Sequence, residues 1–287
     1  MTLFFFTTTG NSLTVARAIG GTIMSIPGIL HGKQREFADD TIGIVTPVYF
    51  GDLPGPVRQF IESVTLHSDY TFLIFTCGTT PACASLKAMR SAGKAGTRFD
   101  YIDAIRMVDN YFPMFDVAKQ VADLPSKHVD DNLNRICTDI AEKRHSLLRP
   151  TLFGRIADAY MKLFPLSSEA YRRFRIEKAK CNTCGTCVKV CPIGNINITD
   201  SHSTPEIWER CLTCGACYHN CPSGAIRYKG EKSTYQFRNP AVSLADIIQA
   251  NDRTRRESAN WVDVLHDTEV HLMLRVVARS PLVIYRK

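Results

Sequence analysis

The sequence lacks long apolar runs. None of its hydrophobic stretches reaches the length of about eighteen residues that suggests a membrane-spanning helix. The first residues also lack the charged, apolar and small-residue regions of a secretory signal peptide. Disulfides persist mainly in oxidising compartments, so a disulfide-stapled secreted domain is not expected either. We therefore expect a cytoplasmic protein that does not enter a membrane.

Two common nucleotide-binding patterns are missing as well. The chain contains neither the triphosphate loop G-x-x-x-x-G-K-[ST] nor the dinucleotide fingerprint G-x-G-x-x-G. Its eight histidines show no metal-ligand spacing, and no nucleic-acid-binding motif accompanies its basic residues. We therefore predict no nucleic-acid partner, and we assign no catalytic residue.

Cysteine, by contrast, is abundant and regularly spaced. Residues 181–192 and 211–222 both have the spacing C-x2-C-x2-C-x3-C-P. This run holds [4Fe–4S] clusters by thiolate ligation in bacterial-type ferredoxins. A structural zinc site can also use paired C-x2-C units, but it would leave the third and fourth cysteine of each run without a role. Residues 175–232 resemble the two-[4Fe–4S] ferredoxins at all eight cysteines, and Cys77, Cys83 and Cys137 are predicted to be free thiols.

The spacing also predicts which cysteines share a cluster. Three cysteines two residues apart can surround one corner of a cubane, whereas the fourth points away from it. In the paired motif the fourth cysteine of each run therefore ligates the other cluster, which brings the two clusters close together. The predicted ligands are Cys181, Cys184, Cys187 and Cys221 for cluster I, and Cys211, Cys214, Cys217 and Cys191 for cluster II.

Residues 1–148 alternate between predicted strands and predicted helices. Strands are expected at 2–6, 41–46, 70–76 and 101–108, and helices at about 13–20, 56–63, 82–93 and 117–148, the last with a break near Pro125. Residues 29–37 are a weak edge strand or a loop in its place. Strands that alternate with helices predict an α/β fold, a doubly wound parallel sheet with helices on both faces.

The loop after the first strand is rich in hydroxyl groups. It contains Thr7, Thr8, Thr9, Gly10, Asn11 and Ser12 and precedes a helix, whose N-terminal N–H groups and dipole favour an anion. A loop of neutral donors suits a phosphate monoester that is held without being cleaved. A Ser- and Thr-rich loop can also simply cap its helix. The loop resembles the phosphate loop [ST]-x-T-G-x-[ST] of flavodoxins, which bind FMN.

Further loops follow the later strands at the same edge of the predicted sheet, where ligands of such sheets bind. The resemblance to flavodoxins implies the strand order 2-1-3-4-5 and places the flavin ring between these loops. Tyr49 and Phe50 can stack on a flavin, and Gly78 lets the backbone approach it. The cofactor-binding residues predicted here are Pro47, Val48, Tyr49, Phe50, Gly51, Thr76, Cys77, Gly78, Thr79, Asn110 and Tyr111.

The segment between the two halves is basic and amphipathic. Residues 143–180 contain ten Lys or Arg and three acids, a surplus equal to the net charge of +7. Apolar residues recur every three or four positions from 152 to 164, which predicts a helix that Pro165 stops. The basic residues are either the solvated face of a packed helix or a docking face for an acidic redox partner. A helix is also expected at 244–250, and residues 271–278 look strand-like.

The complete order resembles the flavodoxin–ferredoxin fusion proteins of anaerobic microbes. The resemblance rests on both cysteine runs and on residues 7–12, 47–51, 109–111 and 238–244. It implies a flavodoxin-like FMN-binding domain (1–148), a helical linker (149–174), a dicluster ferredoxin domain (175–232) and a C-terminal extension of unassigned role (233–287).

This family resemblance implies FMN, two [4Fe–4S] clusters and electron transfer. The leading hypothesis is an iron–sulfur flavoprotein that relays electrons between these groups and an external redox partner. Two alternatives are a flavin-dependent reductase of a small molecule and a redox-sensing module whose flavodoxin half is empty. A homo-oligomer is possible, and the direction of electron flow does not follow from sequence, because cluster potentials span a wide range.

Overall fold

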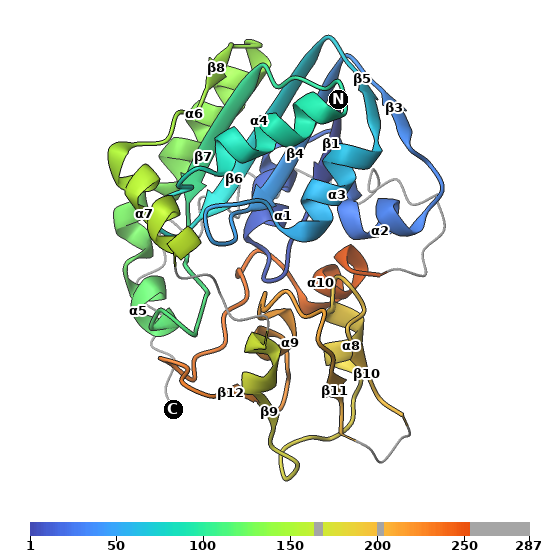
Figure 1. The fold of residues 1–287 in the computed structure, drawn as a ribbon, viewed down its shortest axis with the longest axis vertical. Coiled ribbons are helices and arrows are strands. Elements are labelled where there is room, and N and C mark those ends of the chain that lie inside the picture. The colour runs from blue at the N-terminus through green and yellow to red at the C-terminus, as the bar shows by residue number, and fades with distance from the viewer. Residues whose placement is uncertain (164–168, 200–203, 253–287) are drawn as a thin grey trace.

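A six-stranded parallel sheet forms the first half of the computed structural model, which describes residues 1–163, 169–199 and 204–252 (Figure 1). The strand order is β2-β1-β4-β6-β7-β8. The central strands are apolar and buried on both faces, as expected for parallel strands covered by helices. The sheet strands are β1 (Thr2–Phe5), β2 (Thr22–Ser25), β4 (Thr41–Pro47), β6 (Tyr70–Cys77), β7 (Tyr101–Arg106) and β8 (Ser146–Leu147).

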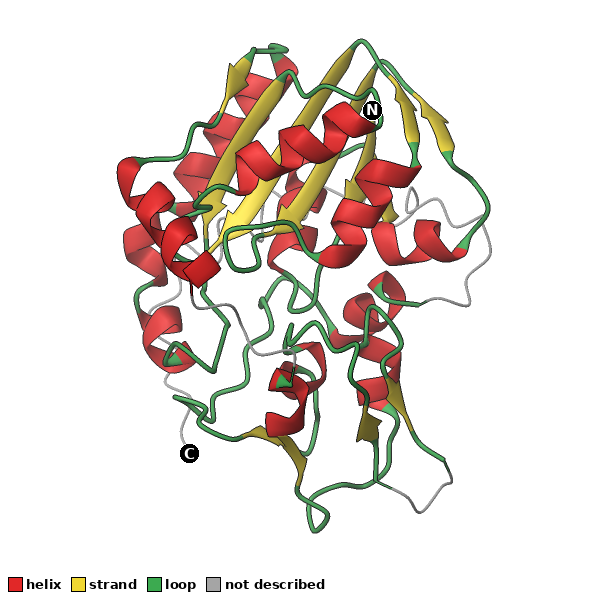
Figure 2. Ribbon diagram, in the orientation of Figure 1, coloured by secondary structure: helices red, strands yellow, loops and turns green. Residues whose placement is uncertain are grey.

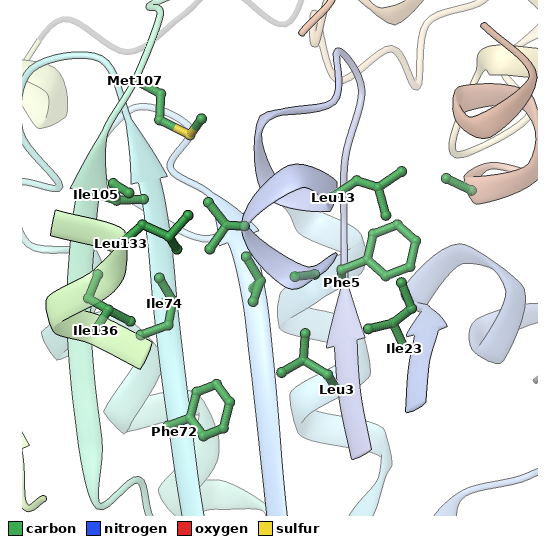
Figure 3. Packing of buried hydrophobic residues seen from close by; sticks show 14 of the residues in the cluster. Leu3, Phe5, Leu13, Ile23, Phe72, Ile74, Ile105, Met107, Leu133 and Ile136 are labelled. Atoms are coloured by element: carbon green, nitrogen blue, oxygen red, sulfur yellow. The ribbon is translucent and has the colours of Figure 1, made fainter. Parts of the chain in front are cut away.

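Helices cover both faces of this sheet, which confirms the predicted α/β class. Helices α1 (Asn11–Ile19) and α6 (Val129–Ala141) pack on one face, as Figure 3 shows for the side chains around Phe5 and Ile74. Helices α2 (Ile26–His31), α3 (Gly55–Ser63) and α4 (Ala84–Lys94) contribute to the core on the other face.

The break predicted near Pro125 is confirmed, whereas the predicted continuation of the helix to residue 148 is wrong. The structure has a short helix α5 (Val117–Ala122), a 3-10 turn η1 (Leu124–Lys127), then α6, and finally strand β8. Pro125 cannot donate a backbone hydrogen bond, and His128 has a left-handed backbone with φ 47°. These two features separate α5 from α6, and the sequence beyond Ala141 adds a strand to the sheet.

Residues 29–37, predicted as an edge strand or a loop in its place, do not form the sheet edge. Strand β2 forms the edge, whereas residues 29–37 contain the end of α2 and the start of β3 (Glu36–Ala38). β3 pairs with β5 (Thr65–His67) in a separate two-stranded sheet. Because of this pair and the added strand β8, the topology does not match a strict 2-1-3-4-5 sheet.

The second half consists of short elements (Figure 2). Two antiparallel strand pairs, β9 with β12 and β10 with β11, flank two short helices that begin within the cysteine runs. The expected strand at 271–278 and the stop at Pro165 lie outside the described residues. The elements are α7 (Leu152–Leu163), η2 (Ala170–Arg173), β9 (Phe174–Ile176), α8 (Thr186–Val190), β10 (Ile196–Asn197), β11 (Glu206–Ile207), α9 (Ala216–His219), β12 (Ile226–Tyr228) and α10 (Leu244–Ala250).

The two halves share one hydrophobic core. Val190 of α8, Ala216 of α9 and Ile247 of α10 belong to the same buried cluster as the residues of α1 and the sheet. An ion pair between Arg17 and Asp246 adds a polar contact between α1 and α10. The cysteine-rich half therefore packs directly against the sheet, next to the carboxyl ends of its strands (Figure 1). Within the described ranges, no helix has the length and apolar character needed to cross a membrane.

Candidate metal centres and adjoining cavity

The four cysteines predicted to ligate cluster II line one small cavity. They are Cys191, Cys211, Cys214 and Cys217, so the set includes one cysteine from the first run. The N–H of Asn195 donates to Cys191 Sγ (3.2 Å), and the N–H of Thr213 donates to Cys211 Sγ (3.3 Å). Hydrogen bonds of this kind stabilise thiolate charge and help to set the potential of a cluster.

The cysteines predicted to ligate cluster I also lie near one another. Burial raises the pKa of Cys187 to about 12, and the charges that Cys221, Cys184 and Cys181 would carry raise it as well. Iron compensates such repulsion, because a bound cation holds a coordinating thiol in its deprotonated form. These three neighbours of Cys187 are the cysteines that the sequence assigns to the same cluster, including Cys221 from the second run. The role of each cysteine as a ligand stays a prediction.

The two cysteine loops have the same backbone conformation. Thr183 and Thr213 both have φ 52°, and Gly185 and Gly215 both have φ 72°. Each glycine directly precedes the short helix of its run, and an L side chain at this φ would be strained. The equal spacing in sequence therefore corresponds to two copies of one local structure.

A larger cavity, of about 580 Å³, lies at the carboxyl ends of the strands. We call it the sheet-edge cavity. Of the residues predicted to bind FMN, only Gly10 is absent from its lining; a Cβ there would lie 2.9 Å from the Cβ of Asn239. The predicted residues in the lining are Thr7, Thr8, Thr9, Asn11, Ser12, Pro47, Val48, Tyr49, Phe50, Gly51, Thr76, Cys77, Gly78, Thr79, Asn110 and Tyr111.

The sheet-edge cavity and the cluster II cavity share a wall. Leu212 and Cys214 line both of them, and Thr213 lines the larger one. Tyr49, which also lines the larger cavity, has a raised pKa, mainly because it is buried and also because Cys214 would carry a negative charge nearby. A predicted cluster ligand thus borders directly on the space where the sequence predicts a flavin.

The hydroxyl groups of the first loop are oriented by the chain itself. The N–H of Gly10 donates to Thr7 Oγ1 (3.0 Å), and the side-chain amide of Asn110 donates to Thr9 Oγ1. Each hydroxyl already accepts a bond, so its hydrogen remains available to a ligand in the cavity. Helix α1 starts at Asn11 and has no acidic residue in its first turn. This arrangement suits an anion.

Three asparagines of the second half hold the same loop. The carbonyl groups of residues 7, 8 and 9 accept hydrogen bonds from the Asn251 side chain (3.3 Å), the Asn220 side chain (3.0 Å) and the Asn239 backbone N–H (2.7 Å). All three asparagines are buried. Asn220 lies between Cys217 and Cys221, so a cysteine run and the hydroxyl-rich loop are directly connected. Sequence analysis missed these contacts.

The loop that contains Asn110 is held by a neutral histidine. His219 Nδ1 accepts a hydrogen bond from the N–H of Phe237 (3.1 Å), so its Nε2 carries the hydrogen and donates to the carbonyl of Asn110 (2.8 Å). Burial lowers the pKa of His219 to about 4. This buried histidine therefore has a structural contact at the cavity edge.

The loop at Gly78 is held by a buried lysine. Lys127 Nζ donates to the carbonyls of Gly78 (3.1 Å) and Met107 (2.7 Å) and to Gln120 Oε1 (2.9 Å). A Cβ at Gly78 would lie 2.1 Å from Asp109 Oδ2. Glycine is therefore required here by the neighbouring loop, a reason that differs from the predicted approach of a flavin.

Helix α7 forms the outer wall of the sheet-edge cavity. Phe153, Ile156 and Tyr160 line the cavity, yet 63%, 59% and 62% of their surfaces are exposed. On its other side, Asp158 forms an ion pair with Lys87 of α4 (2.6 Å). The predicted amphipathic helix is therefore present, but its apolar face borders a cavity and is not covered by the core.

A comparison with known protein families gave one match, which lies in the second half of the chain. Residues 180–226 match the model of the 4Fe-4S dicluster domain, and this range spans both cysteine runs. The chain thus has a dicluster domain, which supports two [4Fe–4S] clusters and implies electron transfer. A comparison with curated proteins gave no match.

A zinc site requires three or four protein ligands grouped around a single ion. Among the residues that the structure describes, no three His, Cys, Asp or Glu side chains form a group that could hold a single metal ion. A cubane instead spreads its ligands over four iron atoms, and it is compatible with thiols that surround a cavity.

Proposed function

We propose that this chain is an iron–sulfur flavoprotein that relays electrons between FMN in the sheet-edge cavity, the two clusters and an external redox partner. One observation carries the proposal: Leu212 and Cys214 form a wall common to this cavity and to the cluster II cavity. A flavin in the larger cavity would lie beside a cluster ligand. Bound FMN exchanges one or two electrons, whereas each cluster exchanges one.

The features of the cavity support FMN as its ligand. Thr7 and Thr9 have hydroxyl hydrogens available for a phosphate, and the rings of Tyr49, Phe50 and Tyr111 offer apolar surface to an isoalloxazine. The topology agrees as well: taken in chain order, the first five strands of the large sheet lie in the order 2-1-3-4-5, with β8 added beyond them. This order supports a flavodoxin-like domain, and with it a flavodoxin–ferredoxin fusion.

The exposure of one predicted ligand of cluster I supports electron transfer from this cluster to a partner protein. Cys184 is exposed, and its thiol donates a hydrogen bond to Thr186 Oγ1 (3.3 Å). Burial raises the pKa of this thiol, but hydrogen bonding with Thr186 and the charge of Lys189 outweigh burial and lower it. Lys178 and Lys180 are exposed near the start of the same cysteine run. An acidic redox partner that docks on this end of the basic segment would approach cluster I, because opposite charges speed encounter and orient the complex.

A small-molecule reductase is the second candidate, and the exposed apolar face of α7 favours it. Two ionisable groups in the lining of the sheet-edge cavity, Cys77 and Tyr111, are candidates for this activity. Burial raises the pKa of Cys77 to about 12 and also raises the pKa of Tyr111, so both stay protonated at neutral pH. Neither is therefore a ready nucleophile or base, whereas the relay function does not need one.

Flavin and iron content test the proposal. Protein purified without oxygen and incubated with FMN should retain about one flavin and about eight iron atoms per chain. The flavin should be released by acid and identified as FMN by chromatography, and the iron measured on the same sample. A preparation with about eight irons that binds no flavin, even at high FMN concentration, would contradict the relay and leave the sensor alternative.

A further inference from the structure

A second cavity lies next to the sheet-edge cavity and is strongly basic. It has a volume of about 680 Å³ and is lined by the side chains of Arg172, Arg173, Arg175 and Lys229. Glu169 is the only acid in its lining. We call it the cationic cavity. Neither the dicluster domain nor the proposed flavin site accounts for it.

Most of these cations lack an acidic partner. Arg172 pairs with Glu169 (3.2 Å), whereas no ion pair joins Arg173, Arg175 or Lys229 to an acid among the described residues. Positive charges that converge without compensation repel one another, and a bound anion would relieve this repulsion. The cavity therefore favours a ligand with negative charge.

The backbone places two of these cations, Arg173 and Lys229, side by side. Strands β9 and β12 pair in antiparallel register, and just beyond the pair the N–H of Lys229 donates to the carbonyl of Arg173 (2.8 Å). The guanidinium of Arg173 lies 6.0 Å from the centre of the Tyr228 ring, which limits its motion. Arginine has a planar fork of donors that matches phosphate and carboxylate groups. The cavity thus presents guanidinium groups of the kind that bind an oxyanion.

The two cavities adjoin each other. Tyr111 and Met114 line both of them, so they form the boundary between the cationic cavity and the flavin side. Beyond this boundary the lining becomes apolar, with Phe115 and the exposed face of α7 around Ile156. A molecule that spans the boundary meets cations at one end and apolar side chains at the other.

We propose that the cationic cavity binds the phosphate or carboxylate group of a small organic molecule whose apolar ring reaches past Tyr111 and Met114 into the sheet-edge cavity. The second part of this inference rests on the proposed flavin function, whereas anion binding does not. A concave site that four cations surround suits a small anion better than the convex face of an acidic protein.

Calorimetric titration with three probes tests the proposal on the cluster-loaded, FMN-treated protein. The probes are phenyl phosphate, benzoate and inorganic phosphate. We expect phenyl phosphate or benzoate to bind at one site, and the probe that binds more tightly identifies the class of anion. This tighter-binding probe should bind at least about tenfold more tightly than inorganic phosphate, because its ring is removed from water. It should also change the flavin absorption spectrum.

Two double variants separate the site from general charge effects. Arg173→Gln with Arg175→Gln should weaken binding of the ring-bearing probe by at least about tenfold, because two charged hydrogen-bond donors are lost. Arg90→Gln with Arg98→Gln removes two exposed arginines from outside both cavities and should leave binding unchanged. Circular dichroism of both variants verifies that they fold.

Three results would overturn the proposal. The first is equal weakening in both double variants. The second is equally weak binding of all probes. The third is binding of polyglutamate, but not of the small probes, that Arg173→Gln with Arg175→Gln abolishes; this would assign the cations to protein docking. If the protein retains no flavin, the proposed function fails, yet the calorimetry still tests the anion site separately.

Discussion

Replacing Cys191 with alanine should remove cluster II and leave cluster I in place. Cys191 belongs to the first run by sequence, but it lines the cavity formed by Cys211, Cys214 and Cys217 of the second run. With only three thiolates, cluster II would have an open iron site and would be lost. Cluster I would keep its four predicted ligands.

The measurement is iron content together with electron paramagnetic resonance of the reduced protein. Iron should fall from about eight to about four atoms per chain, and the signal should change to that of one isolated cluster. Cys137→Ala is the matched control, because Cys137 lies on α6, outside both cluster sites, and its loss should not change the iron content. Retention of cluster II with loss of cluster I would contradict the crossed assignment.

The combined change of Thr9→Val and Ser12→Ala should weaken FMN binding by at least about 2 kcal/mol, roughly thirtyfold. Both hydroxyls line the sheet-edge cavity; Thr9 accepts from Asn110, and Ser12 Oγ lies 2.8 Å from Thr76 Oγ1. Each substitution would remove one hydrogen-bond donor to the phosphate. Because a phosphate is charged, its hydrogen bonds are worth more than those between neutral groups.

Fluorescence titration of flavin-depleted protein with FMN measures this effect. Thr14→Val is a suitable control, since Thr14 lies in the same helix but donates to the carbonyl of Gly10 (3.0 Å) and does not line the cavity. Its affinity for FMN should stay close to that of the unchanged protein. If the double variant also binds FMN normally, the hydroxyl-rich loop does not hold the phosphate.

The parts of the site that could be predicted are those with local sequence signals. The cysteine spacing is specific because it describes a short loop around a cluster, and Gly185 and Gly215 mark its turn. The hydroxyl-rich loop and the later cavity loops could be placed together because parallel strands end at one edge. The edge strand could not be predicted, since β2 has only four residues and contains a single buried one, Ile23.

The contacts that hold the loops depend on tertiary structure and leave no local pattern. Asn220 is 212 positions from Thr8, and Asn251 is 244 positions from Thr7. Lys127 appears in sequence as one more charged residue, yet it is buried beneath the loop of Gly78. The periodicity of residues 152–164 predicts an apolar helix face, but it does not say whether that face meets the core or a cavity.

Electron exchange within a single molecule is the central claim. Protein loaded with FMN and both clusters is kept oxidised without oxygen, its flavin is reduced by a light pulse with a sacrificial donor, and cluster absorption is followed over time. The account predicts that cluster reduction follows flavin reduction at a rate that does not change when the protein is diluted tenfold, because both groups lie in one chain. A rate that falls in proportion to protein concentration, or clusters that stay oxidised, would contradict it.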